Sequence, residues 1–325
     1  MRALIATRPG TLEPGDVPIP ACSARQLLIE TRVSAVSPGS ELRALFEGTR
    51  FPRIGGTGYM AAGVVREVGA DVTNFAPGDA VQFTCSEPVG PHSQFCVAAR
   101  ENAAHLPDGV SLLAGACAYW GVPPYRGILG SGVQYYDDLA VIGLGPLGQC
   151  AVQLLRPIAR RLLAVDLVPS RRDLALTLGA DLALDPADGN LSDAVGQMMP
   201  RGPRVVIELS GSQPGLELAL RLCAPRGTVV VIGVLPPLTG FQLFRPLQDK
   251  GIRLVPIARR GDSLDPAVDR NGDYMADVLD MIQRGKLDVE RLATWVAPWT
   301  DGPELIPRLR TARNEALGVA LTWPE

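Results

Sequence analysis

Three glycines at G-x-G-x-x-G spacing, Gly143, Gly145 and Gly148, separate a short apolar run from a segment with helical apolar spacing. In such a strand–turn–helix unit, the first glycine permits a tight turn and the second lets the backbone approach a pyrophosphate. The third glycine allows the helix to pack closely on the sheet. The helix N-terminus, which begins at Pro146 and Leu147, then offers unpaired N–H groups to phosphates. The spacing therefore predicts a dinucleotide-binding site.

An acid stands where a second strand of this unit is expected to end. Asp166 follows the apolar run 161–165 and lies 18 residues after Gly148, close to where such sites hold an acid on the adenosine ribose. The alternative is an acid that caps a helix or sits in a loop. A carboxylate repels a 2′-phosphate, so we expect NAD rather than NADP. Arg171 and Arg172 keep NADP open, because a guanidinium can accept that phosphate.

The candidate cofactor-binding set also includes two residues that directly follow later apolar runs. These residues are Ser210, after the run 205–209, and Gly233, after the run 228–232. The full set is Gly143, Gly145, Pro146, Leu147, Gly148, Asp166, Arg171, Ser210 and Gly233.

Composition bounds the class of protein. The chain has 325 residues, of which 46% are hydrophobic and 20% charged, typical of a soluble globular protein with one large domain or two. A net charge of −3 gives no reason to expect nucleic acid or an anionic membrane as a partner. No run approaches the roughly 20 apolar residues that span a bilayer, and the start lacks a signal-peptide core, so we expect a cytoplasmic location. Six cysteines without a CxxC pair predict free thiols.

The hydrophobic pattern changes along the chain. Residues 1–107 form short apolar runs broken by Gly and Pro, which predicts a small, mostly antiparallel barrel. From about residue 111, helical runs (the first over 113–129) alternate with strand-like runs, which indicates an α/β unit with a doubly wound parallel sheet. After a polar loop at 259–266 we expect a helix over 274–284, then strands at 293–296 and 317–321 that flank a helix near 304–313.

These motifs together resemble the medium-chain dehydrogenase/reductase superfamily from end to end. The resemblance is carried by the opening (residues 1–4 and 12–20), by Gly63–Gly69 with Val72–Val81, by Leu106–Ser111 and by the glycine loop. It implies a GroES-like β-barrel catalytic domain (1–115 and 259–325) and a Rossmann domain with a doubly wound parallel sheet (116–258). It also implies a homodimer at least.

The departures from this family concern its zinc ligands. Where many relatives have Cys-Gly-(Ser/Thr)-Asp with a zinc-binding cysteine, this chain has Pro38 at the cysteine position. Where they have Gly-His-Glu, it has Tyr59 at the histidine position. Cys117 falls near the third ligand position, but one thiolate makes no tetrahedral site. The four-cysteine structural zinc loop is absent, since only Cys85 and Cys96 lie nearby. We predict no zinc.

The runs Ser37–Glu41 and Gly58–Tyr59 resemble a zinc-free branch of the superfamily, which includes proteins similar to bacteriochlorophyllide dehydrogenase. Without zinc, a side chain must stabilise the developing oxyanion and exchange the proton. Tyr59 could donate a proton to a carbonyl oxygen, or could only fill the space left by zinc. Ser40 stands where related enzymes carry a relaying hydroxyl, or could only cap a loop.

Glu41 and His92 complete the candidate catalytic set. Glu41 could orient or accept a proton, although structural support is the role we favour. His92 matches a family histidine on a strand beside the cleft and is expected to be structural more often than catalytic. Tyr119, Trp120 and Tyr125 follow the domain crossover, where the substrate pocket or simple core packing would use aromatic side chains.

The expected function is a zinc-independent, NAD(H)-dependent oxidoreductase that interconverts a secondary alcohol and a ketone on a specialised small-molecule metabolite. Two other reactions remain open: NAD(P)H-dependent reduction of an activated C=C bond, and redox-neutral epimerisation with retained NAD. A protein that binds the nucleotide without catalysis is the alternative from another class.

Overall fold

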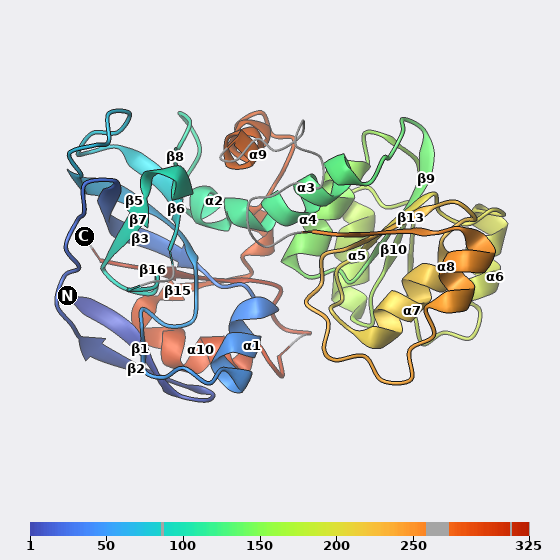
Figure 1. Cartoon of the computed structure of the whole chain (residues 1–325), viewed down its shortest axis with the longest axis horizontal. Coiled ribbons are helices and arrows are strands. Elements are labelled where there is room, and N and C mark those ends of the chain that lie inside the picture. The colour runs from blue at the N-terminus through green and yellow to red at the C-terminus, as the bar shows by residue number, and fades with distance from the viewer. Residues whose placement is uncertain (86–87, 258–272, 313, 325) are drawn as a thin grey trace. The chain divides into compact units, whose positions relative to one another are not determined.

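The computed structural model describes residues 1–85, 88–257, 273–312 and 314–324 (Figure 1). The chain divides into two compact units, one formed by Met1–Tyr119 with Gly272–Glu325 and the other by Trp120–Asn271. The first boundary lies after Tyr119, compared with the expected 115/116. The second expected boundary, 258/259, and the expected loop at 259–266 lie outside the described residues.

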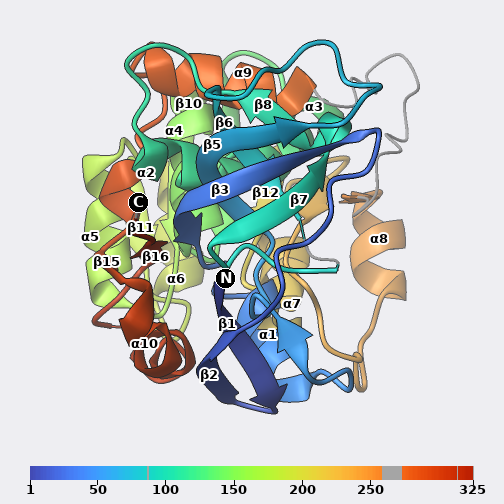
Figure 2. The same ribbon diagram turned by 90° about the vertical axis from the view of Figure 1, so that its left-hand side faces the viewer.

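The first unit is built mainly from antiparallel strands, as expected for a GroES-like domain (Figure 2). A seven-stranded sheet has the order β15-β16-β3-β5-β6-β8, with β7 paired to β3, and a smaller sheet has the order β2-β1-β4. The elements are β1 (Arg2–Arg8), β2 (Thr11–Asp16), β3 (Gln26–Ala35), α1 (Ser40–Glu47), β4 (Arg53–Ile54), β5 (Met60–Val68), β6 (Ala80–Thr84), β7 (Phe95–Ala99), η1 (Arg100–Asn102), β8 (Ala103–His105), α2 (Leu112–Cys117), α9 (Asp273–Gln283), η3 (Glu290–Leu292), β15 (Trp295–Pro298), η4 (Trp299–Asp301), α10 (Gly302–Arg308) and β16 (Val319–Thr322).

Strand β3 is the centre of this unit because it pairs with β5, β7 and β16. Its residues Leu27 and Ile29 are fully buried in one apolar cluster with strands β5 and β6. After β3, the chain turns into α1, whose Leu42 and Leu45 are buried in a second cluster with the C-terminal segment. This burial fixes the start of α1, which carries the candidate catalytic residues Ser40 and Glu41.

The second unit is a parallel sheet with the strand order β11-β10-β9-β12-β13-β14. Numbered within the unit, this order is 3-2-1-4-5-6, the arrangement of a Rossmann domain. Its elements are α3 (Val122–Gly130), β9 (Asp137–Ile142), α4 (Pro146–Leu155), β10 (Ala159–Val165), α5 (Pro169–Thr177), β11 (Leu182–Leu184), α6 (Leu191–Met198), β12 (Val205–Glu208), α7 (Gln213–Leu222), β13 (Thr228–Val231), α8 (Phe244–Lys250) and β14 (Arg253–Pro256); η2 (Ala118–Trp120) precedes α3. The expected fold class is therefore confirmed.

The apolar runs of these strands are continuous because helices cover both faces of the sheet. On β9, Leu139 and Val141 belong to one core cluster, whereas Ala140 and Ile142 belong to the other. This division follows from the two-residue side-chain period of a strand. The carboxyl ends of β9 and β12, which are neighbours in the sheet, mark the switch point where such folds bind their ligands.

Two details differ from the sequence-based expectation. The helical run expected over 113–129 is interrupted, because α2 ends at Cys117 and α3 begins at Val122, with prolines in its first turn. The C-terminal helix is shorter than expected and ends at Arg308. The amphipathic helix expected over 274–284 is confirmed as α9. Across the described residues, no helix combines the length and the apolar composition that a membrane span requires.

The two-sided core of the Rossmann unit leads to a stability prediction. Replacement of the fully buried Leu139 by alanine should lower the free energy of unfolding by about 2–5 kcal/mol, because it leaves a cavity between sheet and helices. The matched control is Leu176→Ala on α5, where the side chain is 45% exposed and the change should stay within about 0.5 kcal/mol. Chemical denaturation followed by circular dichroism measures both, and equal losses would contradict the assignment of Leu139 to the core.

Candidate active site

The predicted cofactor residues lie together at the carboxyl ends of the parallel strands. Gly143 follows β9 and has a φ of +89°, a conformation that strongly favours glycine. A side chain there would also come within 2.5 Å of the Ser210 backbone nitrogen at the end of β12. A side chain on Gly148 would collide with the Gly143 carbonyl oxygen. Both glycines are therefore required by the close packing of the turn against its neighbours.

The start of α4 offers a site for an anion. The helix begins at Pro146, with Gly145 as its N-cap residue and no side-chain hydrogen bond to the cap. Proline lacks an N–H group, and the following N–H groups of the first turn have no carbonyl partner within the helix. No described atom comes within 4 Å of the position that a Gly145 side chain would take. The geometry fits a phosphate group bound at this helix N-terminus.

Asp166 joins the glycine turn to the loop after β10. Its Oδ2 accepts a hydrogen bond from the Leu144 N–H at 2.7 Å, and its Oδ1 accepts one from the Val168 N–H at 2.8 Å. The N-cap residue of α5 is Val168, so Asp166 is not a simple helix cap. A carboxylate has about four acceptor positions, which leaves capacity for ribose hydroxyl groups.

The two arginines on α5 have different surroundings. Arg172 Nη1 donates to the carbonyl oxygens of Asp166 and Leu167, and it forms an ion pair with Asp185 at 3.0 Å. The guanidinium of Arg172 is therefore engaged within the protein. The backbone carbonyl of Arg171 accepts a hydrogen bond from the buried Gln149 side chain, which ties α5 to α4.

Glu208 at the end of β12 belongs to this site although sequence reasoning missed it. Its side chain is completely buried, and Oε1 accepts hydrogen bonds from the backbone and the hydroxyl of Ser210. Its Oε2 has no hydrogen-bond partner among the described residues. Burial raises the pKa of Glu208, and the Ser210 hydrogen bonds oppose this shift. A side chain on Gly233 would come within 2.9 Å of Oε2, so Gly233 leaves room for this carboxyl group. The only sequence signal was an acid at the end of an apolar run.

In the first unit, the structure brings the two predicted proton-transfer hydroxyls together. The Tyr59 hydroxyl lies 3.2 Å from Ser40 Oγ, and Ser40 Oγ lies 3.0 Å from Ser37 Oγ. Ser40 is the first residue of α1, and Tyr59 immediately precedes β5. Both residues are partly exposed, whereas Ser37 is buried. The arrangement is a row of three hydroxyl groups with Tyr59 at one end.

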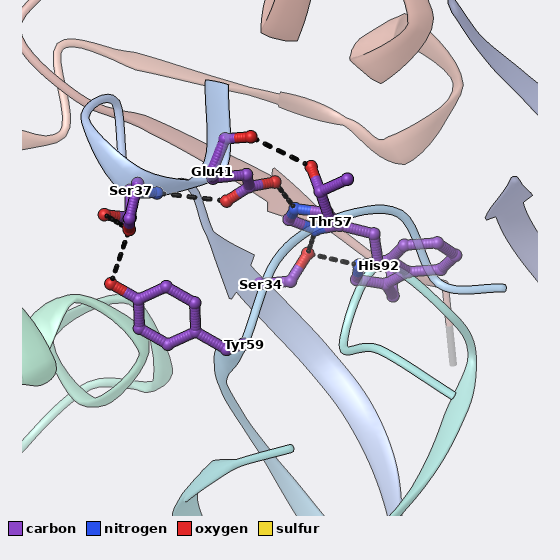
Figure 3. Close-up of polar contacts among 8 residues, drawn as sticks. Ser34, Ser37, Glu41, Thr57, Tyr59 and His92 are labelled. Atoms are coloured by element: carbon purple, nitrogen blue, oxygen red, sulfur yellow. Dashed lines mark hydrogen bonds and ion pairs between the residues drawn. The ribbon is translucent and has the colours of Figure 1, made fainter. Parts of the chain in front are cut away.

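Glu41 and His92 form a buried pair behind this row (Figure 3). His92 Nε2 lies 2.7 Å from Glu41 Oε1, and both side chains are fully inaccessible to solvent. Glu41 Oε2 accepts a hydrogen bond from the Ser37 N–H at 3.1 Å. On its other side, His92 Nδ1 lies 2.8 Å from Ser34 Oγ. Since neither side chain reaches the surface, their geometry fits the positioning of neighbouring residues rather than direct contact with a substrate.

Two glycines make room for the imidazole ring of His92. A side chain on Gly58 would lie 2.6 Å from His92 Nε2, and one on Gly56 would lie 2.9 Å from His92 Cδ2. Gly58 directly precedes Tyr59, so the placement of the tyrosine depends on how closely this segment passes His92.

The three aromatic candidates are divided between the two units. Tyr119 packs edge-on against Tyr59, with ring centroids 5.5 Å apart and planes at 79°. Tyr119 is therefore a direct neighbour of the Tyr59 ring. Trp120 is fully buried in the second unit, and its indole N–H has no partner among the described residues. Burial of this kind indicates core packing for Trp120. Tyr125 lies on α3 in the same unit.

The residues at the family's zinc positions do not form a ligand set. Pro38 has no donor atom in its side chain, and Tyr59 bonds to Ser40. Glu41 is engaged by His92, and Cys117 is buried in α2. Within the described ranges, no group of three or more His, Cys, Asp or Glu residues could hold a metal ion. The residue types thus do not fit the family's catalytic zinc.

Comparison with known proteins assigns both units to families. Residues 23–135 match the alcohol dehydrogenase GroES-like domain, and residues 146–272 match the zinc-binding dehydrogenase family. The second match lies outside positions 38 and 59, so its name carries no information about those ligands. D-guloside 3-dehydrogenase of Escherichia coli K12 is 29% identical over 255 residues, covering 76% of this chain and 71% of that protein.

Solved structures show the same fold over the whole chain. A putative zinc-binding dehydrogenase from Sinorhizobium meliloti 1021, bound to NADP, is 21% identical with a TM-score of 0.85 and 99% coverage of both chains. A short chain alcohol dehydrogenase from E. coli CFT073, complexed with NADH, is 18% identical with a TM-score of 0.86 and 99% coverage of both chains. Together with the family matches, these findings place the chain in the medium-chain dehydrogenase/reductase superfamily of oxidoreductases.

The close approach at Gly58 leads to a prediction about the site's framework. Gly58→Ala should lower the melting temperature and disturb the His92–Glu41 bond, because the new methyl group would lie 2.6 Å from His92 Nε2. The matched control is Gly196→Ala on α6, where no described atom lies within 4 Å and the change should be neutral or stabilising. Thermal unfolding of both variants measures the difference; an unchanged melting temperature for Gly58→Ala would show that the segment can move aside.

Proposed function

We propose that this protein is a zinc-independent, NAD(H)-dependent oxidoreductase that interconverts a secondary alcohol and a ketone. The observation that carries the proposal is the hydrogen-bonded pair of Tyr59 and Ser40, with Tyr59 standing at a position where many relatives have a zinc ligand. The pair offers hydroxyl groups suited to stabilise an oxyanion and to exchange its proton, the task that zinc serves in those relatives. We further propose a specialised small-molecule metabolite as substrate.

A bound nicotinamide dinucleotide would supply or accept the hydride, and side chains of the protein would transfer the proton. In the direction of reduction, the Tyr59 hydroxyl would give its proton to the oxygen of the carbonyl group that the cofactor reduces. Ser40 Oγ, 3.2 Å from the Tyr59 oxygen, is placed to donate a hydrogen bond to the phenolate and to relay to it a proton from solvent, because Ser40 is partly exposed. In the direction of oxidation, the alcohol proton would pass to the Tyr59 phenolate, which forms when the Tyr59 proton leaves through the partly exposed Ser40 to solvent.

The choice of a secondary alcohol draws on a relative. The E. coli relative is named as a 3-dehydrogenase of a D-guloside, which supports an alcohol group on a small polar molecule as the reacting group. An NADP complex and an NADH complex occur among the structural neighbours, so these neighbours support a nicotinamide dinucleotide without choosing between the two.

Two features of α5 and its preceding loop favour NAD. The carboxylate of Asp166 lies beside the glycine turn and would repel a 2′-phosphate. Arg172, one of the two cations that could have neutralised that phosphate, directs its Nη1 to two backbone carbonyls and to Asp185. The proposal is therefore NAD(H), with NADP(H) as the alternative outcome of the binding test below.

The proton-transfer assignment is tested with Tyr59→Phe and Ser40→Ala. Each should lower kcat by about 10² or more, because general acid–base catalysis contributes that much, while the Kd for NADH stays unchanged. Turnover is measured with NAD⁺ and a panel of secondary alcohols that includes 2,3-butanediol and methyl glycosides. If both variants keep kcat within about threefold of the wild type, the assignment is wrong.

Experiments with deuterium-labelled NADH separate the other hypotheses about the reaction. Deuteride transfer from labelled NADH to a carbonyl carbon supports the proposal, whereas transfer to an activated C=C bond supports the reductase. Tightly retained NAD with turnover but no net redox change would identify an epimerase. Absence of any hydride transfer, with NADH binding intact, would identify a non-catalytic protein.

The cofactor preference is tested with Asp166→Ser. Loss of the carboxylate should weaken NADH binding by about tenfold or more, since hydrogen bonds to a charged group contribute roughly 1.5–3 kcal/mol, and should narrow the preference over NADPH. The matched control is Asp173→Ser, the same change at an exposed position of α5. Calorimetric titration with NADH and NADPH gives both constants; tighter wild-type binding of NADPH would overturn the assignment to NAD.

A further inference from the structure

Ser37, in the turn between β3 and α1, is held at several points. Its Oγ lies 3.0 Å from Ser40 Oγ. Its N–H donates to Glu41 Oε2 at 3.1 Å, and its carbonyl oxygen accepts from the Glu41 N–H at 3.0 Å. Only 5% of the residue is exposed. Ser37 therefore connects the partly exposed Ser40, through its hydroxyl group, to the buried pair of Glu41 and His92, through its backbone.

Three hydrogen bonds link Trp323, Ser34, His92 and Glu41. Their directions follow from one group that can only donate, the Trp323 indole N–H, and one that can only accept, the Glu41 carboxylate. The indole N–H of Trp323 can only donate, so Ser34 Oγ accepts from it at 2.9 Å. The Ser34 hydroxyl hydrogen is then available for His92 Nδ1 at 2.8 Å. The Glu41 carboxylate can only accept, so His92 donates from Nε2 to Oε1, and a ring with its proton on Nε2 accepts at Nδ1 from the Ser34 hydroxyl. Figure 3 shows His92 between Ser34 and Glu41.

We propose that Ser37 is a positioning residue for Ser40, and that the Glu41–His92 pair is the buried brace that fixes Ser37. This inference rests on the proposed role of Tyr59 and Ser40 in proton transfer. Because both side chains are fully buried, Glu41 and His92 act by positioning their neighbours, and Ser37 is the neighbour that contacts Ser40.

The physical reason lies in the freedom of the Ser40 hydroxyl. A serine side chain has three staggered rotamers, and its hydrogen can rotate further. Ser40 Oγ has a hydroxyl partner on each side, Tyr59 at 3.2 Å and Ser37 at 3.0 Å. With Ser37 present, one rotamer of Ser40 satisfies both partners and directs Ser40 towards the Tyr59 oxygen. Without it, rotamers that do not contact Tyr59 become populated, so the reacting groups lose their preorganisation.

Kinetics of Ser37→Ala test the first part of the proposal. We expect kcat to fall about tenfold, while the KM of the substrate and the Kd of NADH stay within about twofold, because Ser37 affects proton transfer and not binding. Ser37→Thr keeps a hydroxyl group and should recover most of this loss. The matched truncation control is Ser23→Ala at an exposed position in the same unit, which should behave as the wild type.

The outcomes separate this inference from the proposed function. If Tyr59→Phe and Ser40→Ala lower kcat but Ser37→Ala does not, or if Ser37→Thr is as impaired as Ser37→Ala, the inference is wrong and the proposed function stands. If Tyr59→Phe and Ser40→Ala have no effect, the proposed function fails first. Equal loss of kcat and substrate binding in Ser37→Ala would indicate a general structural role and would also overturn the inference.

Nitrogen NMR of the intact wild-type protein tests the brace without any activity assay. The chain has two histidines, so selective ¹⁵N-histidine labelling gives one buried ring, His92, and one half-exposed ring, His105, as the reference. We expect the neutral Nε2–H tautomer for His92. The Nδ1–H tautomer would contradict the direction derived above and would overturn the brace.

Glu41→Gln makes this test sharper. A glutamine amide has one acceptor oxygen and one donor nitrogen, yet it faces two donors, the Ser37 N–H and the His92 Nε2–H. One possible response of the variant is that His92 converts to the Nδ1–H tautomer while the bond to Ser37 is kept. The other is that the bond to Ser37 is lost, with a kcat loss similar to that of Ser37→Ala. An unchanged His92 spectrum together with unchanged kcat would show that Glu41 does not brace Ser37.

Discussion

The framework of the candidate catalytic unit depends on one buried acid. The Glu41 side chain has no access to solvent, and a buried carboxyl group is costly unless hydrogen bonds satisfy it. Its two oxygens accept hydrogen bonds from His92, in the loop before β7, and from the backbone of Ser37, in the turn before α1. The hydrogen bonds to Glu41 therefore fix the turn that leads into Ser40. Through His92, they also fix how closely the backbone at Gly58 packs against the imidazole ring.

A second constraint governs the nucleotide-binding unit. Because all strand pairs of its sheet are parallel, the loops after β9, β10, β12 and β13 emerge at one edge. Residues 143, 166, 210 and 233 are far apart in the sequence and gather there for this reason alone. The buried carboxyl of Glu208 lies under the same edge, which accounts for a glycine at position 233. Topology thus brings these residues to one edge of the sheet, whereas the preference for NAD that we propose depends on an individual side chain, Asp166.

At the positions of the family's zinc ligands, this chain carries other residue types on the same fold. Where many relatives have a metal ligand, Tyr59 presents a hydroxyl group, and the nearby acid, Glu41 on α1, is engaged by His92, which lies in the loop before β7 and not on the strand expected from the sequence. A fold that holds a site in this way constrains where the reacting groups lie and leaves open which chemistry they perform. The relation of this chain to dehydrogenases therefore fixes its class, whereas the proton-transfer groups have to be derived from its own residues.

The sequence by itself determined the class of each unit and the cofactor turn. Glycine spacing, strand periodicity and an acid after β10 are local patterns, and they reflect backbone conformation and burial that neighbouring residues set. The sequence also shows that Pro38 and Tyr59 replace two of the family's zinc ligands, because this depends only on residue type. Only the tertiary structure decided which residues far apart in the sequence contact one another. Glu41 contacts His92, 51 positions away, and Ser34 contacts Trp323, 289 positions away. The contacts of Arg172, the burial of Glu208 and the contacts of Ser37 belong to this second group, because no local pattern encodes which distant side chain satisfies a buried polar atom.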